Sequence, residues 1–176
     1  MSALRTPFWW DRSDRPAQLE AVIFSVDALL VDPRADERAL ADAVWDLHCA
    51  GIRVAAVTSA EWSAAHQPLR ELLGDGAVEV LVTRDEVSRP KPDSETYRHA
   101  LWQLGVRATD AVAIEDSVLG LRAAVGAGLT TAVVTDRSAL GDFSGAAAVL
   151  ASHQASEHLS VQGCRRMLLG SQLLSA

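Results

Sequence analysis

The stretch Ala21–Asp32, with the sequence AVIFSVDALLVD, carries the strongest indication of the fold. Its first half, Val22–Val26, is apolar except for Ser25, and Asp27 follows at once. A short run without alternation of apolar and polar residues is typical of a strand that is buried on both faces of a parallel sheet. The stretch therefore predicts a central strand that ends in a loop bearing a serine and an aspartate.

Further runs of this kind alternate with segments of helical periodicity along the chain. Strands are predicted at 22–26, 52–57, 78–82, 111–114, 129–134 and 146–150, and helices at 36–50, 61–73, 94–105, 118–125 and 157–169. Leu40, Val44 and Leu47 show the helical spacing, and Gly51 stands where a helix C-cap is expected. The pattern predicts an α/β fold, a single Rossmann-like three-layer domain with a central parallel sheet.

Length, charge and cysteine usage restrict the class of protein. The chain has 176 residues, enough for one domain with a core of its own, and a formal net charge of −7 without a basic stripe. This charge argues against a nucleic-acid partner. Cys49 and Cys164 lack the spacing of a metal site or a disulfide framework. With no leader and no long apolar run in the sequence, we expect a cytoplasmic protein without a membrane partner.

The ends of the chain differ from its middle. We expect an N-terminal aromatic arm at 1–18, a core at 19–152, and a C-terminal helix and tail at 153–176. Aromatic clusters either pack over their own domain or anchor a partner. The tail either ends the final helix or pairs in a dimer, and its apolar stretch is short for the third alternative, a membrane anchor. A homo-oligomer would use one of two groups of residues: Phe8, Trp9 and Trp10 of the arm, or Leu168, Leu169, Leu173 and Leu174 of the tail.

Polar side chains follow three of the predicted strands, and one loop adds a lysine. Ligands of parallel sheets bind beyond the carboxyl ends of the strands, so these side chains should share one edge. Clustered carboxylates favour a hard cation such as Mg²⁺ together with a phosphate, which the lysine and a hydroxyl would bind. The residues concerned are Ser25, Asp27, Thr58, Ser59, Lys91, Glu115 and Asp116.

Four segments carry a resemblance to a known family. FSVDALLVD, AAVTSA, SRPKPDSETY and VAIEDSVLGLRAAVGAG, found in this order between Ala21 and Val134, resemble the four motifs of the haloacid dehalogenase (HAD) superfamily of phosphohydrolases. The subgroup that they resemble contains phosphoglycolate phosphatases and beta-phosphoglucomutases. The resemblance implies a HAD-like core, Mg²⁺ as cofactor and phosphate esters as substrates.

The first motif departs from the family pattern Asp-x-Asp-Gly-Thr. Ser25 stands at the position of the nucleophilic aspartate, and Asp27 matches the second aspartate. In the family that second residue is the general acid and base and binds the metal through its backbone carbonyl. Ala28 and Leu29 replace the glycine and the threonine.

The other motifs keep the expected residue types. The resemblance implies that Thr58 or Ser59 holds the phosphate and that Lys91 stabilises its charge and takes part in catalysis. It also implies that the acidic pair Glu115 and Asp116 binds the metal. Without the carboxylate at position 25, Mg²⁺ binding should be weak or absent.

Loss of the nucleophile predicts impaired catalysis. Removing such a group costs on the order of 10⁴- to 10⁶-fold in rate, and the sequence indicates no histidine or lysine placed to take the proton of Ser25. Three hypotheses follow. The first is an impaired HAD-like protein, a pseudoenzyme, that binds a phosphorylated small molecule or a protein. The second is a slow or altered Mg²⁺-dependent phosphomonoester hydrolase in which water attacks directly and Asp27 acts as base. The third is a structural assembly subunit.

The spacing of the motifs predicts a capless domain. The intervals between Asp27 and Thr58 and between Ser59 and Lys91 are filled by the predicted core helices and strands. Such a site would be open to solvent and exclude water poorly. Selectivity for a small substrate would then require a partner subunit, or the substrate would be a macromolecule.

Overall fold

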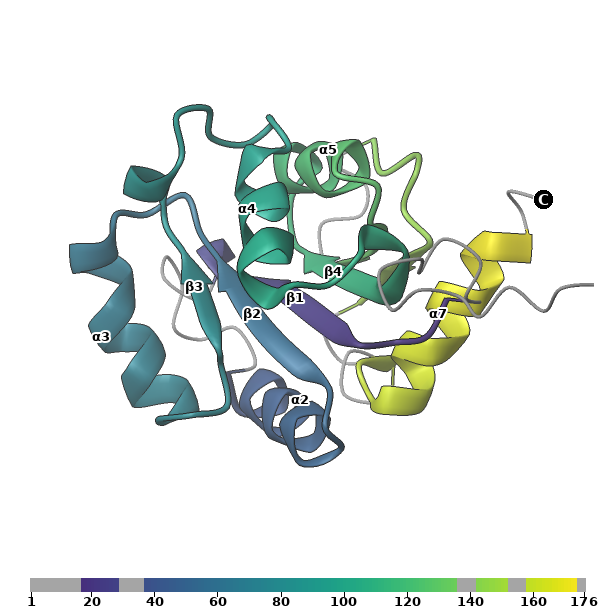
Figure 1. Cartoon of the computed structure of the whole chain (residues 1–176), viewed down its shortest axis with the longest axis horizontal. Helices are drawn as coiled ribbons and strands as arrows, with labels where there is room; N and C mark the ends of the chain where they lie inside the picture. Colours follow the sequence, from purple (N-terminus) through teal and green to yellow (C-terminus); the bar gives the residue numbers. More distant parts are fainter. Residues whose placement is uncertain (1–16, 29–36, 136–141, 152–157, 174–176) are drawn as a thin grey trace, which may run out of the picture.

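A computed structural model describes residues 17–28, 37–135, 142–151 and 158–173 (Figure 1). Six strands form one sheet in the order β3-β2-β1-β4-β5-β6, and every neighbouring pair is parallel. The strands are β1 (Ala21–Ser25), β2 (Arg53–Val57), β3 (Val80–Val82), β4 (Ala111–Glu115), β5 (Thr130–Val134) and β6 (Ala148–Leu150).

Helices cover both faces of this sheet, which gives three layers (Figure 1). One face packs against α2 (Glu37–Cys49), α3 (Trp62–Leu73) and α7 (Val161–Leu173), and the other against α4 (Glu95–Leu104) and α5 (Val118–Gly126). Two short 3₁₀ helices, η1 (Arg84–Glu86) and η2 (Ala108–Asp110), precede α4 and β4. The predicted α/β fold with a central parallel sheet is confirmed.

The apolar character of β1 follows from its central position. Val22 and Phe24 point to the core beneath α2 and α7, whereas Ala21 and Ile23 point to the core beneath α4 and α5. All four side chains are buried. Because successive residues of a strand face opposite sides, a strand covered on both sides needs apolar residues at every position.

The predicted elements agree with the observed ones except at their ends. The largest difference is in the last helix, predicted at 157–169 and observed at Val161–Leu173. At its beginning, a β-carbon on Gly163 would lie 2.0 Å from the backbone oxygen of His158. The chain therefore turns closely onto the first turn of α7, and only a residue without a side chain fits at position 163.

The strand order places the expected site residues at one edge of the sheet. β1 lies between β2 and β4, with Ser25 paired to Val57 and Phe24 to Ile114. The carboxyl ends of the three strands are therefore level, and the loops that follow them meet. Between the motifs, the described residues form α2 and β2 in the first interval and α3, β3 and η1 in the second, and of these α2, β2, α3 and β3 contribute side chains to the core.

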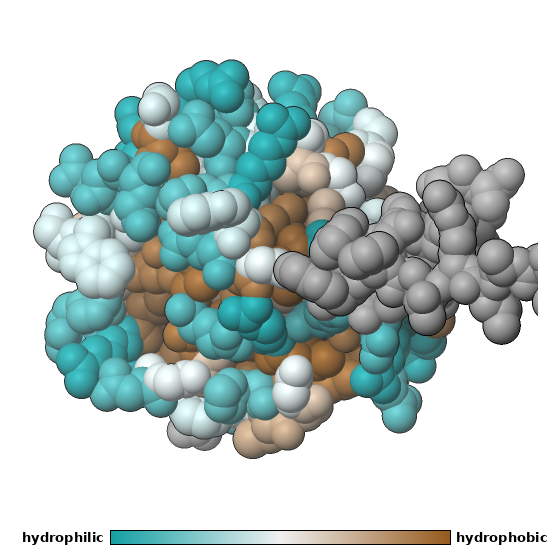
Figure 2. All heavy atoms as spheres, in the orientation of Figure 1, coloured by the Kyte–Doolittle hydropathy of each residue, from teal (hydrophilic) through white to brown (hydrophobic). Residues whose placement is uncertain are grey.

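Strand β3 forms one edge of the sheet, with α3 and α4 on either side (Figure 1). In Figure 2, apolar surface lies between the more polar surfaces of these helices. A groove here is lined by both apolar and polar side chains. Its apolar lining consists of Trp62, Leu69, Leu73, Val78, Val80 and Leu81.

The expected arm and tail fall largely outside this description. Phe8, Trp9, Trp10 and Leu174 belong to residues that the structure does not describe. In α7, Leu168 is buried in the core beside Cys164, whereas Leu169 is exposed. Within the described parts of the chain, the helices are too short or too polar to span a bilayer.

Candidate functional site

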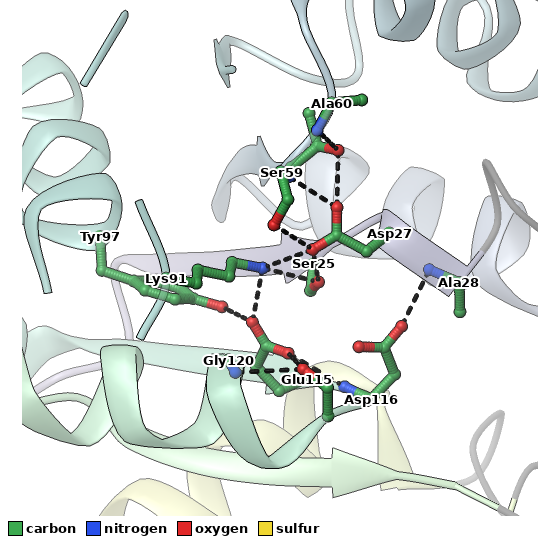
Figure 3. Close-up of polar contacts among 12 residues, drawn as sticks. Ser25, Asp27, Ala28, Ser59, Ala60, Lys91, Tyr97, Glu115, Asp116 and Gly120 are labelled. Atoms are coloured by element: carbon green, nitrogen blue, oxygen red, sulfur yellow. Dashed lines mark hydrogen bonds and ion pairs between the residues drawn. The ribbon is translucent and has the colours of Figure 1, made fainter. Parts of the chain in front are cut away.

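The predicted site residues meet at the carboxyl ends of β1, β2 and β4 (Figure 3). Ser25 is the last residue of β1 and Glu115 the last residue of β4, and Asp27 lies two residues beyond the end of β1. Thr58 and Ser59 follow β2 directly. The structure brings these side chains together around Lys91, which comes from the loop before α4.

Lys91 contacts three oxygen atoms from the strand ends. Its Nζ donates to Ser25 Oγ at 3.0 Å, to Asp27 Oδ2 at 3.0 Å and to Glu115 Oε1 at 2.8 Å. The Lys91 side chain is 4% exposed, and its ammonium lies 5.7 Å from the centre of the Tyr97 ring. An ammonium has three hydrogens, so each can serve one of these contacts.

The charges around Lys91 keep it protonated. Burial opposes a buried ammonium, but the carboxylates of Glu115 and Asp27 outweigh this effect and raise the pKa of Lys91 above its ordinary value. Lys91 thus lies beside Ser25 at the predicted edge of the sheet, although the two residues are 66 positions apart in the chain. The lysine nevertheless acts as a donor to Ser25 and is a poor base for it.

The carboxylate of Asp27 accepts hydrogen bonds on both oxygens. Oδ1 accepts from Thr58 Oγ1 at 2.7 Å and from the backbone N–H of Ser59 at 2.6 Å. Oδ2 accepts from Lys91 Nζ and from Ser59 Oγ at 3.2 Å, and lies 3.5 Å from Ser25 Oγ. Burial opposes ionisation, but Lys91 and the hydrogen bonds outweigh it and lower the pKa of Asp27.

Glu115 is held by a set of donors beneath the rim. Its side chain is fully buried, and Oε1 accepts from Tyr97 Oη as well as from Lys91. Oε2 accepts from the backbone N–H of Asp116 and from Ser117 Oγ. Burial, together with the neighbouring Glu115 carboxylate, raises the pKa of Tyr97 well above its ordinary value, so the phenol keeps its proton and donates.

Tyr97 and Gly120 are site residues that sequence reasoning missed. Both stand inside the quoted motifs, Tyr97 at the end of SRPKPDSETY and Gly120 five residues after Glu115. A β-carbon at position 120 would overlap the Glu115 carboxyl group. The signal in the sequence was the glycine near the start of a helix, where glycine is otherwise unfavourable.

Asp116 faces a different part of the rim from Asp27. Its Oδ2 accepts from the backbone N–H of Ala28 at 2.9 Å, whereas its buried Oδ1 has no hydrogen-bond partner. Burial and the Glu115 charge raise the pKa of Asp116 to about 6. A buried unpaired carboxylate oxygen is costly, and such an atom indicates a position open to a proton or a cation.

The set of oxygen donors for a metal ion is small. Among the described residues, no group of three or more carboxylate, histidine or cysteine side chains is arranged to hold a metal. The oxygens of Asp27 and Glu115 are engaged by protein donors, and Ser25 contributes a hydroxyl. One carboxylate oxygen, on Asp116, stays free. This set is poorer in anionic oxygen than a divalent hard cation usually requires.

The fold is that of a Rossmann-like α/β domain, and comparison with known proteins identifies the family to which the domain and its motifs belong. A family model described as haloacid dehalogenase-like hydrolase matches residues 3–128. The chain therefore belongs to the haloacid dehalogenase-like hydrolases. Its similarity to members of the phosphoglycolate phosphatase and beta-phosphoglucomutase-like subgroup agrees with the resemblance found in the motifs.

Two curated relatives and one solved structure illustrate this similarity. Protein CbbY of Cereibacter sphaeroides is 41% identical over 93 residues, which cover 51% of this chain and 40% of the relative. A plasmid-borne phosphoglycolate phosphatase of Cupriavidus necator is 39% identical over 85 residues, which cover 48% of this chain and 36% of the relative. These alignments thus span at most 40% of the length of either relative.

The structural likeness extends further along the chain. The crystal structure of CbbY from Rhodobacter sphaeroides in complex with phosphate matches with a TM-score of 0.66 at 22% identity. The match covers 84% of this chain and 100% of that chain. At this level of identity the comparison shows a shared fold.

Proposed function

We propose that this protein binds a phosphorylated ligand at the carboxyl edge of its sheet and is impaired in hydrolysing it. The observation that carries this proposal is the contact between Lys91 and Ser25. Ser25 Oγ stands at the position of the family nucleophile and accepts a hydrogen bond from a protonated lysine at 3.0 Å. A hydroxyl held in this way is not activated for attack.

The surroundings of Ser25 offer it no effective base. The nearest carboxylate oxygen, Asp27 Oδ2, lies 3.5 Å away, at the limit of a hydrogen bond. The pKa of Asp27 is also lowered, and a general base works best when its pKa lies near the working pH. For both reasons we expect no covalent intermediate on Ser25.

Binding of a phosphoryl group is supported by the donors that remain. Three donors converge on the Asp27 carboxylate: the Thr58 hydroxyl, the Ser59 amide and the Lys91 ammonium. These are the kinds of group that hold phosphate oxygens in proteins. A serine at position 25 removes one carboxylate that would repel the ligand. The phosphatase names of the relatives support a phosphomonoester as the ligand class.

We propose further that Mg²⁺ binds weakly or not at all. Asp27 would offer such an ion its backbone carbonyl, and Asp116 its free carboxylate oxygen. Glu115 would not be a ligand, because Lys91 engages its carboxylate. If Mg²⁺ binds, it would neutralise phosphate charge beside Asp116. The sequence predicts a domain without a cap, and an open site of this kind could accept a phosphorylated segment of another protein.

A slow hydrolase is the second candidate. Asp27 is 26% exposed, so a water molecule could reach its carboxylate and attack a bound phosphoryl group directly. Such a reaction needs no nucleophile at position 25, and Asp27 would take the proton. Its lowered pKa makes this reaction slow. A purely structural subunit, the third hypothesis, would show neither phosphate binding nor turnover.

The test is hydrolysis of a broad panel of phosphate esters with Mg²⁺ by the natural protein, Ser25→Asp and Asp116→Asn. We expect an inert natural protein that binds inorganic phosphate, and turnover that appears in Ser25→Asp. Turnover by the natural protein that Asp116→Asn abolishes would favour the slow hydrolase. Absence of phosphate binding and of turnover in all three proteins would favour the structural subunit.

A further inference from the structure

We infer that the carboxylate of Asp27 occupies the phosphate-binding position, so that a phosphoryl ligand must displace it before binding. The donors that it engages are called here the anion cradle: the Thr58 hydroxyl, the amide and hydroxyl of Ser59, and the Lys91 ammonium. This inference rests on the proposed function and adds to it the residue that controls access to the site.

The contacts of Asp27 resemble those of a bound anion more than those of a free catalytic acid. Both of its oxygens are engaged, one by Thr58 and the Ser59 amide, the other by Lys91 and the Ser59 hydroxyl. Figure 3 shows the carboxylate between Ser59 and Lys91, with its dashed contacts running to both. A hydroxyl, an amide and an ammonium aimed at one point form a site for any small oxyanion.

The same donors cannot fully serve two anions. The hydroxyl hydrogen of Thr58 is committed to Asp27 Oδ1 at 2.7 Å, and all three hydrogens of Lys91 have partners. A phosphate that approached the occupied cradle would meet a carboxylate and few free donors. Like charges at short range repel strongly where water is partly excluded. Binding therefore requires that the Asp27 side chain rotates away.

The position of Asp27 allows this movement. Asp27 lies two residues beyond the end of β1 and its side chain is 26% exposed, so it can exchange its protein donors for water. Lys91 would stay in place, because Glu115 holds it at 2.8 Å from the buried side. The cradle thus survives the departure of Asp27. The apparent affinity for phosphate equals the affinity of the empty cradle multiplied by the fraction of time in which the cradle is empty.

Asp116 provides a matched control for the effect of charge. It is a carboxylate on the same rim, but its hydrogen bond runs to the backbone N–H of Ala28 and reaches none of the cradle donors. Asp116→Asn removes one negative charge without emptying the cradle. Asp27→Ala removes one negative charge and empties it.

The experiment measures binding of inorganic phosphate by calorimetry, with EDTA present and at constant ionic strength. We expect Asp27→Ala to bind at least about ten-fold more tightly than the natural protein, a difference of about 1.4 kcal/mol. Asp116→Asn should gain much less. The double variant Asp27→Ala/Thr58→Val should lose most of the gain, because the hydroxyl donor of the cradle is absent. Thermal unfolding of each variant verifies that it is folded.

The outcomes separate this inference from the proposed function. If the natural protein binds phosphate and Asp27→Ala binds no better, the occupied cradle is wrong while phosphate binding stands. If Asp27→Ala and Asp116→Asn gain equally, the effect is one of charge alone and the inference is also wrong. If Asp27→Ala binds and the natural protein does not, the inference holds and phosphate binding by the natural protein fails. If folded natural protein and folded Asp27→Ala both fail to bind, both proposals fall.

Discussion

The Glu115 carboxyl group occupies the space that a side chain at Gly120 would need. A β-carbon built on Gly120 would lie 1.8 Å from Glu115 Oε2 and 2.0 Å from its carboxyl carbon. The buried carboxylate could yield only by leaving Lys91 and Tyr97, to which it is hydrogen-bonded. Because Gly120 has no side chain, Glu115 can take this position and hold Lys91 in place.

We expect Gly120→Ala to lower the free energy of unfolding by about 1–3 kcal/mol or more, as overpacking of an interior commonly does. Denaturant titration measures the loss. Gly126→Ala is the matched control, because it lies in the same helix and its β-carbon would meet its nearest neighbour, Ser94 Cβ, at an ordinary 3.5 Å. That variant should be neutral or slightly stabilising. Equal effects of the two substitutions would contradict the packing argument.

Lys91 compensates the buried charge of Glu115, and its removal should be costly. In Lys91→Met the fully buried carboxylate keeps Tyr97 as a donor but loses its cation. Breaking one partner of a buried ion pair typically costs about 3–5 kcal/mol. Denaturant titration at pH 8 measures the loss.

An exposed ion pair of the same kind gives the control. Arg70 and Asp75 form a contact at 2.6 Å, with side chains that are 54% and 73% exposed. Arg70→Met should change the free energy of unfolding by less than about 1 kcal/mol. If Lys91→Met were equally mild at pH 8, Lys91 would not be essential to the charge balance of the site.

The stability of the protein should depend on pH through Asp116. Its pKa in the folded state is raised to about 6 from an ordinary 3.8. The folded form therefore binds the proton more tightly than the unfolded form, and its contribution to stability is present at low pH and is lost as the pH rises from about 4 to 6. The full difference corresponds to about 3 kcal/mol.

Asp116→Asn should remove this loss. With EDTA present, we expect the variant to be more stable than the natural protein at pH 8, where Asp116 is ionised and the amide of asparagine is not. Near pH 4 the two proteins should be similarly stable, because Asp116 is then protonated in the folded state. Denaturant titrations at the two pH values provide the comparison. A variant that is destabilised at pH 8 would show that ionised Asp116 is paired with a group that stabilises it.

The fold was predictable from the sequence because the sheet is covered on both faces. Strands such as Ala111–Glu115 are apolar at nearly every position, and the residues that follow them can be assigned to the same edge without knowledge of distances. The ends of the elements were less predictable, as α7 shows, because they depend on close contacts such as that of Gly163 with the His158 backbone.

The internal arrangement of the site could not be predicted in the same way. Tyr97 reaches Glu115 because α4 packs over β1, β2 and β3, a tertiary relationship without a local signal. The sequence likewise indicates that Lys91 and Asp27 belong to one site, but it does not give the side-chain rotation that places the Asp27 carboxylate among the donors. The direction of the hydrogen bond between Lys91 and Ser25 depends on the charges of two further carboxylates.

Ser25→Asp should create a metal site where the natural protein offers too few anionic oxygens. A carboxylate at the end of β1 would join the free oxygen of Asp116 across the rim. Hard divalent cations bind more tightly as the number of carboxylate ligands rises. We expect the dissociation constant for Mg²⁺ to fall by at least about ten-fold, measured by calorimetry at constant ionic strength. Ser25→Asn, which adds an oxygen of similar reach without charge, should give little of this gain. A natural protein that binds Mg²⁺ as tightly as Ser25→Asp would show that the serine is a competent part of a metal site.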